Sequence, residues 1–277
     1  MRALRSALFL LPLAALTLSA CQGNQRAREL AYVERPVEQL YMRGIDELDN
    51  RDYETAILVF NEVERQHPYS EWARRSALMS AFAAFEARNY DEAISTARRY
   101  ISLNPAADGA AYAYYLISVS YFEQIMDVGR DQKITEDARL ALTDVVRRYP
   151  DSDYARDAEI KLDMVADQLA GKDMEIGRWY LRRNQHLSAL NRFKNVVETY
   201  ETTSHTPEAL HRMVEAYLSI GLEQEAKATG AVLGYNYPES DWYRDTYRLL
   251  TRQGIDPEDA TDNQRRTWLQ RIIPGGK

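Results

Sequence analysis

The segment DYETAILVFNEVERQHP, residues 52–68, decides the fold class of this chain. Ala56, Phe60 and Val63 stand at positions i, i+4 and i+7, which places them on one face of a helix. The small alanine lets a neighbouring helix approach closely, and Pro68 ends the segment because proline cannot continue the helical hydrogen-bond ladder. The pattern predicts the second helix of a two-helix hairpin.

The same pattern recurs four times further along the chain. The segments NYDEAISTARRYISLNP (89–105) and EDARLALTDVVRRYP (136–150) repeat both the spacing and the terminal proline. The fourth copy, around Phe193, has TTSHTP in place of the proline, and the fifth ends at Pro238. A single hairpin cannot bury its apolar face, so the copies must stack on one another. We therefore predict an all-α fold, a tetratricopeptide-repeat superhelix of five helical hairpins with a C-terminal capping helix.

Composition agrees with a folded helical protein and argues against nucleic-acid binding. The chain has 45% hydrophobic and 28% charged residues, with only 12 Gly and 9 Pro among 277 residues, which favours helix over disorder. The net charge of -7 becomes -9 once the first twenty residues, which carry Arg2 and Arg5 and no acid, are removed. Nucleic-acid binding needs a clustered basic face, so an acidic chain predicts no nucleic-acid partner.

The first 21 residues have the pattern of an export signal that ends in the only cysteine of the sequence. Arg2 and Arg5 precede a short apolar stretch, which is too short for a transmembrane helix and typical of a signal peptide. The run LSAC, residues 18–21, resembles the lipobox of bacterial lipoproteins. We therefore predict a covalent lipid (S-diacylglycerol and N-acyl) on Cys21 as the sole membrane anchor, since two or more acyl chains hold firmly. The alternative is ordinary secretory cleavage beside a free thiol.

The spacing between the repeats predicts how the chain is divided. Residues 126–135 are inserted between the helices of the third hairpin, and residues 153–184 read as one long helical run, weakly interrupted at Gly171. That run is a natural junction between two halves. The predicted parts are a signal peptide (1–20), a lipidated tether (21–34), an N-terminal half of three hairpins (35–152), a C-terminal half of two hairpins with a capping helix at 241–253 (153–253), and a flexible tail (254–277).

No catalytic motif is found in the sequence. It has no Gly-x-Ser-x-Gly elbow, no phosphate-binding glycine loop and no His-Glu-x-x-His pair. None of the four histidines has another histidine at i+4 on a predicted helix, the spacing that zinc sites commonly use. We therefore expect no enzyme activity, no metal and no cofactor beyond the lipid. A hydrolase built on a helical scaffold stays as an alternative that would require a polar cluster in a cleft.

The first helix of each hairpin is expected to line the concave face of a tetratricopeptide stack. In the first three hairpins this face is rich in aromatic side chains, which suits an extended peptide with apolar or aromatic residues. For each of these residues the alternative is packing in the core between hairpins. The predicted peptide-binding residues are Tyr41, Ile45 and Leu48, then Arg75, Leu78, Phe82 and Phe85, then Tyr112, Tyr115, Val119 and Phe122.

Four segments resemble a known family at the level of sequence. They are HPYSEWARRSALMSAFAAF (67–85), AYAYYLISVSYFEQIMDVGRDQ (111–132), RRYPDSDYARDA (147–158) and HTPEALHRMVEAYLSIGL (205–222). Together with the lipobox, they make the chain similar to the BamD family, the tetratricopeptide lipoproteins of the outer-membrane β-barrel assembly (BAM) machinery. The resemblance covers roughly residues 30–250, and only Cys21 carries over as a residue that a motif defines.

The resemblance implies a location and a set of partners. The location is the periplasmic face of the outer membrane. The partners are a BamA-like barrel protein bound through its POTRA domain, other BAM lipoproteins, and unfolded outer-membrane proteins awaiting assembly and insertion. The alternative is another periplasmic tetratricopeptide lipoprotein, one that acts as an adaptor for cell-wall enzymes or proteases.

Overall fold

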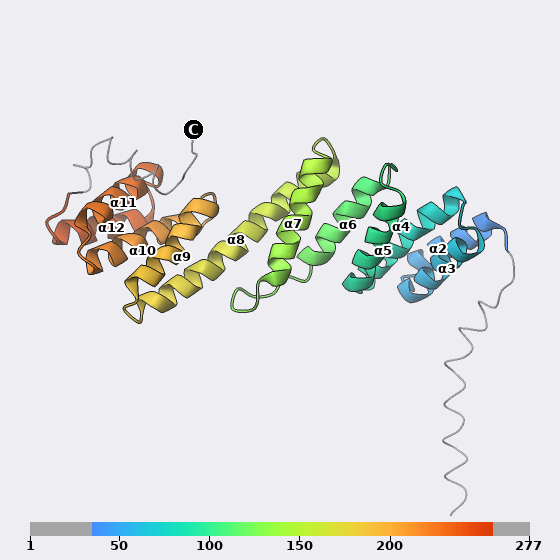
Figure 1. The fold of residues 1–277 in the computed structure, drawn as a ribbon, viewed down its shortest axis with the longest axis horizontal. Helices are drawn as coiled ribbons and strands as arrows, with labels where there is room; N and C mark the ends of the chain where they lie inside the picture. Colours follow the sequence, from blue (N-terminus) through green and yellow to red (C-terminus); the bar gives the residue numbers. More distant parts are fainter. Residues whose placement is uncertain (1–34, 257–277) are drawn as a thin grey trace, which may run out of the picture. The chain divides into compact units, whose positions relative to one another are not determined.

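The computed structural model describes residues 35–256, and within that range the chain forms eleven helices and no strand (Figure 1). The predicted signal peptide, Cys21, the tether up to residue 34 and the tail from residue 257 lie outside the described residues. None of the helices described here has the length and hydropathy needed to cross a membrane.

The described residues fall into two compact units, divided between Ser76 and Ala77 inside one helix. The first unit holds helix α2 (Val37–Asp49), helix α3 (Tyr53–Gln66) and the start of helix α4 (Glu71–Glu86). The second unit holds the rest of α4 and the helices α5 (Tyr90–Leu103), α6 (Ala110–Phe122), α7 (Lys133–Arg148), α8 (Asp153–Leu181), α9 (His186–Thr199), α10 (Thr206–Ser219), α11 (Glu223–Asn236) and α12 (Asp241–Arg252).

Consecutive helices pair as the repeats predict. Helix α2 packs on α3, α6 on α7, α8 on α9 and α10 on α11, and residues of α4 and α5 share one apolar cluster. Helix α12 packs on both α10 and α11, so it caps the last hairpin. The predicted fold class, all-α with five helical hairpins and a C-terminal capping helix, is confirmed for the part of the chain that the structure describes.

Two hairpins in different units use the same close contact between their helices. A Cβ atom added at Gly44 of α2 would lie 2.5 Å from the ring of Phe60 on α3. A Cβ atom added at Gly177 of α8 would lie 2.4 Å from the ring of Phe193 on α9. Both phenylalanines are fully buried, so each ring fills the space that a side chain on the facing glycine would need.

The turn between the helices also repeats. Arg51, Arg88, Asn184 and Gly221 each adopt a positive φ, between 57° and 76°, at the turn that joins the two helices of a hairpin. This left-handed conformation lets the chain reverse directly after the first helix. The third hairpin lacks such a turn because the inserted residues connect its helices instead.

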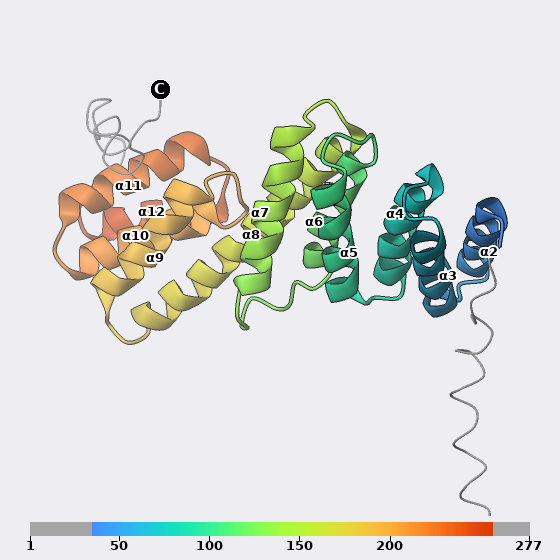
Figure 2. The ribbon, with the colours of Figure 1, turned by 45° about the vertical axis from the view of Figure 1, so that its right-hand side comes forward.

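Helix α8 is uninterrupted over 29 residues, so the predicted weak break at Gly171 is wrong. Gly171 is buried, and an added Cβ atom would lie 3.1 Å from Val128 and 3.2 Å from His205. The glycine therefore allows close approach to neighbouring segments while the helix continues through it. Figures 1 and 2 show α8 running from α7 to α9, where it packs on both.

The insertion of the third hairpin lies three residues earlier than predicted. It spans residues 123–132, because α7 already begins at Lys133. Two side chains of α8 hold it: Gln168 Nε2 donates to the carbonyl of Met126 at 2.6 Å, and Lys172 Nζ donates to the carbonyl of Gly129 at 3.2 Å. The inserted loop is thus fastened to the long helix that follows it.

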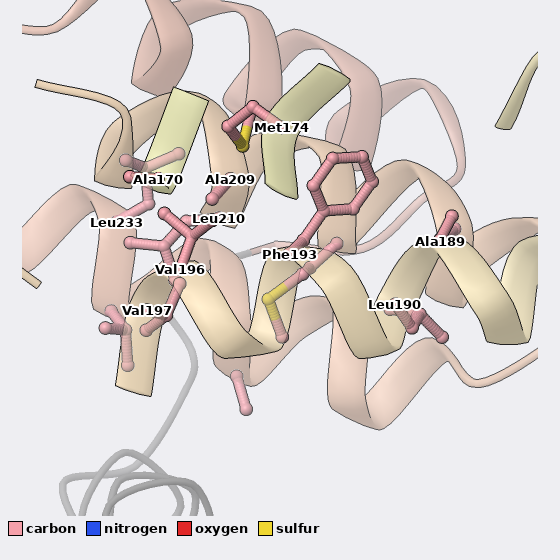
Figure 3. Close-up of a cluster of buried hydrophobic side chains, with 14 residues drawn as sticks. Ala170, Met174, Ala189, Leu190, Phe193, Val196, Val197, Ala209, Leu210 and Leu233 are labelled. Atoms are coloured by element: carbon pink, nitrogen blue, oxygen red, sulfur yellow. The ribbon is translucent and has the colours of Figure 1, made fainter. Parts of the chain in front are cut away.

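The largest apolar cluster joins α8, α9, α10 and α11 (Figure 3). Phe193 of α9 is fully buried there, together with Met174 of α8 and Leu233 of α11. Helix α12 adds a second, smaller cluster in which Leu250 is fully buried against Val214. Its N-terminus is capped by Ser240, whose hydroxyl accepts a hydrogen bond from the backbone N–H of Trp242 at 3.2 Å.

Candidate peptide-binding surface

Helix α6 positions most of the candidate surface. Its sequence, AAYAYYLISVSYF, contains no charged residue, and a helix that is apolar all round is normally enclosed by neighbours. Here α5, α7 and the first half of α8 pack around it, as the two ribbon views show (Figures 1 and 2). Tyrosine suits the partly enclosed positions of α6, because each ring packs on the core while its hydroxyl reaches a polar group or solvent.

Three tyrosine rings gather where α6 meets α8. The ring of Tyr154 on α8 lies 5.7 Å from that of Tyr112 and 5.1 Å from that of Tyr115, both on α6. All three side chains are half-buried, so each has one part in the core and one part accessible. Such tilted aromatic contacts contribute on the order of 1 kcal/mol beyond the area that the rings bury.

A polar group fixes the position of the Tyr115 ring. The hydroxyl of Tyr115 donates to Asp157 Oδ2 at 2.7 Å, and Lys161 Nζ donates to the same carboxylate oxygen at 2.7 Å. The ammonium of Lys161 also lies 5.5 Å from the centre of the Phe122 ring, within the range of a cation–π contact. The aromatic surface is defined here as Tyr112, Tyr115, Phe122 and Tyr154 together with the Asp157–Lys161 pair.

The ionisation of this surface follows from its contacts. Burial raises the pKa of Tyr115 well above its usual value, and the hydrogen bond to Asp157 adds to the rise, so this hydroxyl stays protonated and donates. Burial alone would raise the pKa of the Asp157 carboxyl, but hydrogen bonds from Lys161 and Tyr115 outweigh it and hold this pKa below its usual value. At neutral pH the surface therefore presents phenol rings beside the Asp157–Lys161 ion pair, whose two charges cancel.

The predicted residues of the second unit differ in what they offer to a partner. Leu78, Phe82 and Phe85 of α4 are half-buried and pack on the same apolar cluster as Tyr112 and Tyr115. Phe122 is half-buried against the cluster of α7 and α8.

Val119 is different, because it is only 6% exposed and belongs to the core cluster itself. Its side chain packs between helices and presents almost no surface. We therefore leave Val119 out of the aromatic surface, although the repeat position predicted it there.

The first unit holds the remaining predicted residues. The ring of Tyr41 on α2 lies 5.7 Å from Phe60 and 4.9 Å from Trp72, and the guanidinium of Arg75 lies 5.5 Å from the centre of the Trp72 ring. Ile45 and Leu48 are half-buried, whereas Arg75 is exposed. The first unit thus has an aromatic cluster of its own, with an arginine at its edge.

Repeat positions in the first three hairpins did not predict the contribution of α8. Tyr154, Asp157 and Lys161 stand at i, i+3 and i+7, the same spacing as Tyr112, Tyr115 and Val119 on α6. That spacing could have identified the three α8 residues from the sequence. They lie N-terminal to the fourth hairpin, however, in a part of α8 that extends beyond the length of a helix in the repeat. Among residues 35–256, no group of three or more His, Cys, Asp or Glu side chains is placed to hold a metal ion.

The matching family model and the curated relatives agree on one family. Residues 33–233 match the family model YfiO, described as "Outer membrane lipoprotein". The chain is 54% identical to the outer membrane protein assembly factor BamD of Caulobacter vibrioides over 267 residues, which cover 96% of this chain and 88% of that protein. It is 41% identical to the protein of the same name from Rickettsia prowazekii, with 85% of this chain and 92% of that protein covered. Among solved structures, the TPR domain of P58(IPK) aligns with a TM-score of 0.40 and 16% identity, over 85% of this chain and 64% of that one.

Proposed function

Because this chain belongs to the BamD family of outer membrane protein assembly factors, we propose that it is a lipoprotein subunit of the β-barrel assembly machinery at the outer membrane. In this role it is a non-catalytic scaffold, which binds a BamA-like barrel protein and receives unfolded outer-membrane proteins for insertion. The names and the extent of the matched relatives support the assembly role.

The aromatic surface is the observation that carries the proposed substrate binding. An unfolded barrel protein offers extended segments whose side chains alternate between two sides, and in barrel strands one of these sides is apolar and often aromatic. Half-buried rings held rigidly by a core bind such side chains at a small cost in conformational entropy. The rings of Tyr112 and Tyr115 each lie within 6 Å of the Tyr154 ring, and the protonated hydroxyl of Tyr115 is already oriented by Asp157.

A binding measurement with one peptide tests this role. The probe is a fluorescent peptide from the last strand of an outer-membrane β-barrel protein, ending in an aromatic residue. Tyr115→Asp places a charge among the rings, so we expect binding weaker by at least about tenfold, which corresponds to roughly 1.4 kcal/mol. Tyr115→Phe removes only the hydroxyl and should bind within about threefold of the unchanged protein, a small difference on the same scale.

The matched control for the peptide measurement is Tyr69→Asp. Tyr69 is fully exposed in the connection between α3 and α4 and is not part of the aromatic surface, so the same substitution there leaves the rings of that surface unchanged. Circular dichroism should give equal helix content for all three variants. Undiminished affinity of a folded Tyr115→Asp variant would place the peptide elsewhere on the protein.

The second binding role concerns the C-terminal hairpins. We assign the contact with the POTRA domain of a BamA-like protein to the two final hairpins and the cap, residues 153–253, and the substrate role to the N-terminal half, residues 35–152. Pull-down of the membrane-anchored protein in mild detergent should recover a BamA-like barrel protein. Recovery of cell-wall synthases, hydrolases or proteases in its place would instead make the chain an adaptor lipoprotein.

A further inference from the structure

A depression of ≈ 380 Å³ opens at the last hairpin, between α10, α11 and the capping helix α12. Two half-buried leucines, Leu218 of α10 and Leu249 of α12, form its apolar part. Four polar residues line the rest of it: Glu215, Ser219, Glu223 and Gln253. The depression thus combines an apolar floor with a polar rim.

The rim is acidic. Of the six described residues that line the depression, two are glutamates and none is basic. Glu215 is already engaged, since Arg212 Nη1 donates to its carboxylate at 2.8 Å. Glu223 is exposed, and Glu225 follows it in the first turn of α11, so the net charge at the rim stays negative. A ligand for this site should therefore be basic and carry a few apolar side chains.

The chain leaves the described region beside this depression. Helix α12 ends in a turn in which Gly254 has a φ of +75°, Gly254 N–H donates to Thr251 and Ile255 N–H donates to Leu250, both at 3.0 Å. This helix termination reverses the chain. Ile255 consequently packs on the cluster of Val214, Ala226 and Leu250, against which the two leucines of the depression also pack. Asp256, the last described residue, follows directly, so the described part of the chain ends beside the depression.

The sequence that follows has the complementary chemistry. After Asp262 the remaining 15 residues contain Arg265, Arg266, Arg271 and Lys277 and no acidic residue. Two apolar pairs, Trp268 with Leu269 and Ile272 with Ile273, are four positions apart, a spacing that lets both pairs contact the same surface if the segment is helical. The eleven residues between Asp256 and Trp268 can span up to about 40 Å, which is ample for a site at the exit point.

We propose that residues 265–273 dock on this depression in the same molecule, with the Trp268 side chain on Leu218 and Leu249 and the arginines facing Glu223 and its neighbours. The segment then covers apolar surface at the end of the repeat array, where no further hairpin follows α12 in the described chain. Terminal faces of repeat proteins need such a cover to remain soluble.

Crosslinking in the full mature chain tests where the segment lies. A photoreactive amino acid at Thr267 leaves Trp268 and the arginines intact. We expect crosslinks within the monomer to peptides that contain residues 215–223 or 249–253. Crosslinks that form only between two molecules, that map to other helices, or that do not rise above background would overturn the proposal.

Charge reversal tests how the segment binds. Glu223→Lys should lower the crosslink yield at least about fivefold, and adding Arg265→Glu and Arg266→Glu to that variant should restore it. The control Glu239→Lys makes the same change at an exposed glutamate that does not line the depression. Equal yields in the Glu223→Lys variant and the control would contradict the proposed pairing.

Hydrogen exchange gives a second readout that does not need a crosslinker. Trp268→Asp in the full chain should speed exchange of backbone amides in residues 215–223 and 249–253 at least about fivefold, while amides of α8 and α9 keep their rates. Unchanged exchange in both segments would show that Trp268 does not cover them and would also overturn the proposal.

Discussion

At the scale of single residues, the glycine and phenylalanine pairs explain why two hairpins tolerate only the smallest side chain. Replacing Gly177 by alanine should gain about 1 kcal/mol of helix propensity. The new methyl group would however stand 2.4 Å from the ring of Phe193, which is fully buried among other side chains. Overpacking of this kind costs about 1–3 kcal/mol, so the clash outweighs the propensity.

We therefore expect Gly177→Ala to lower the free energy of unfolding by about 1–2 kcal/mol, and urea denaturation should measure it. Phe193→Leu removes the ring edge and should recover part of the loss when combined with Gly177→Ala. The control Gly129→Ala meets only the exposed carboxylate of Asp127 and should change stability far less. A Gly177→Ala protein as stable as the original would mean that the two helices shift apart at little cost.

At the scale of helices and their connections, most of the architecture is predictable from the sequence. The apolar spacing and the prolines at 68, 105, 150 and 238 mark where second helices end, and α3, α5, α7 and α11 each end two residues before such a proline. Proline cannot donate to the helical ladder and restricts the residue before it, which makes this signal strong. The capping helix was predicted at 241–253 and ends one residue earlier.

The parts that the sequence did not predict depend on tertiary contacts. Gly171 is a weak helix former, yet α8 continues through it because Val128 and His205 pack on that point. The repeat position placed Val119 on an open face, but its side chain belongs to the buried cluster formed by α4, α5 and α6. Local pattern gives the face of a helix that carries apolar side chains, whereas the neighbour that covers it depends on the whole chain.

The contact between α6 and α8 makes a pH-dependent contribution to stability through Asp157. Its pKa is lower in the folded protein than its usual value of 3.8, so the contribution is present above that value and is lost as the pH falls through the lower folded pKa. Asp157→Asn should therefore be less stable than the unchanged protein at pH 7, and the difference should shrink as the pH falls below 3.8.

Urea titrations of both proteins at several pH values measure this difference. The control Asp163→Asn lies on the same helix with an exposed side chain and should show a smaller difference at pH 7. A difference for Asp157→Asn that does not shrink as the pH falls below 3.8 would mean that the ion pair does not stabilise the α6–α8 contact.

At the scale of the whole molecule, the proposed role requires that the repeat domain stay beside the outer membrane. The family description as an outer membrane lipoprotein and the LSAC sequence that ends at Cys21 both support a lipid at that residue. A single acyl chain binds a bilayer only marginally, whereas two or more give stable anchoring. A diacylglycerol on the thiol together with an N-acyl chain would therefore hold the protein firmly at the membrane surface.

We expect Cys21→Ser to move most of the protein from the membrane pellet to the soluble fraction, because serine offers no thiol for the lipid. Ser19→Ala keeps a small residue before the cysteine and should leave the protein in the pellet. Mass spectrometry of the mature wild-type chain should find Cys21 at the N-terminus with the added mass of the acyl chains. An N-terminal Cys21 with a free thiol would exclude the lipid anchor. The helical fold and the aromatic surface do not depend on the anchor, so the peptide-binding measurement could still succeed if the lipid is absent.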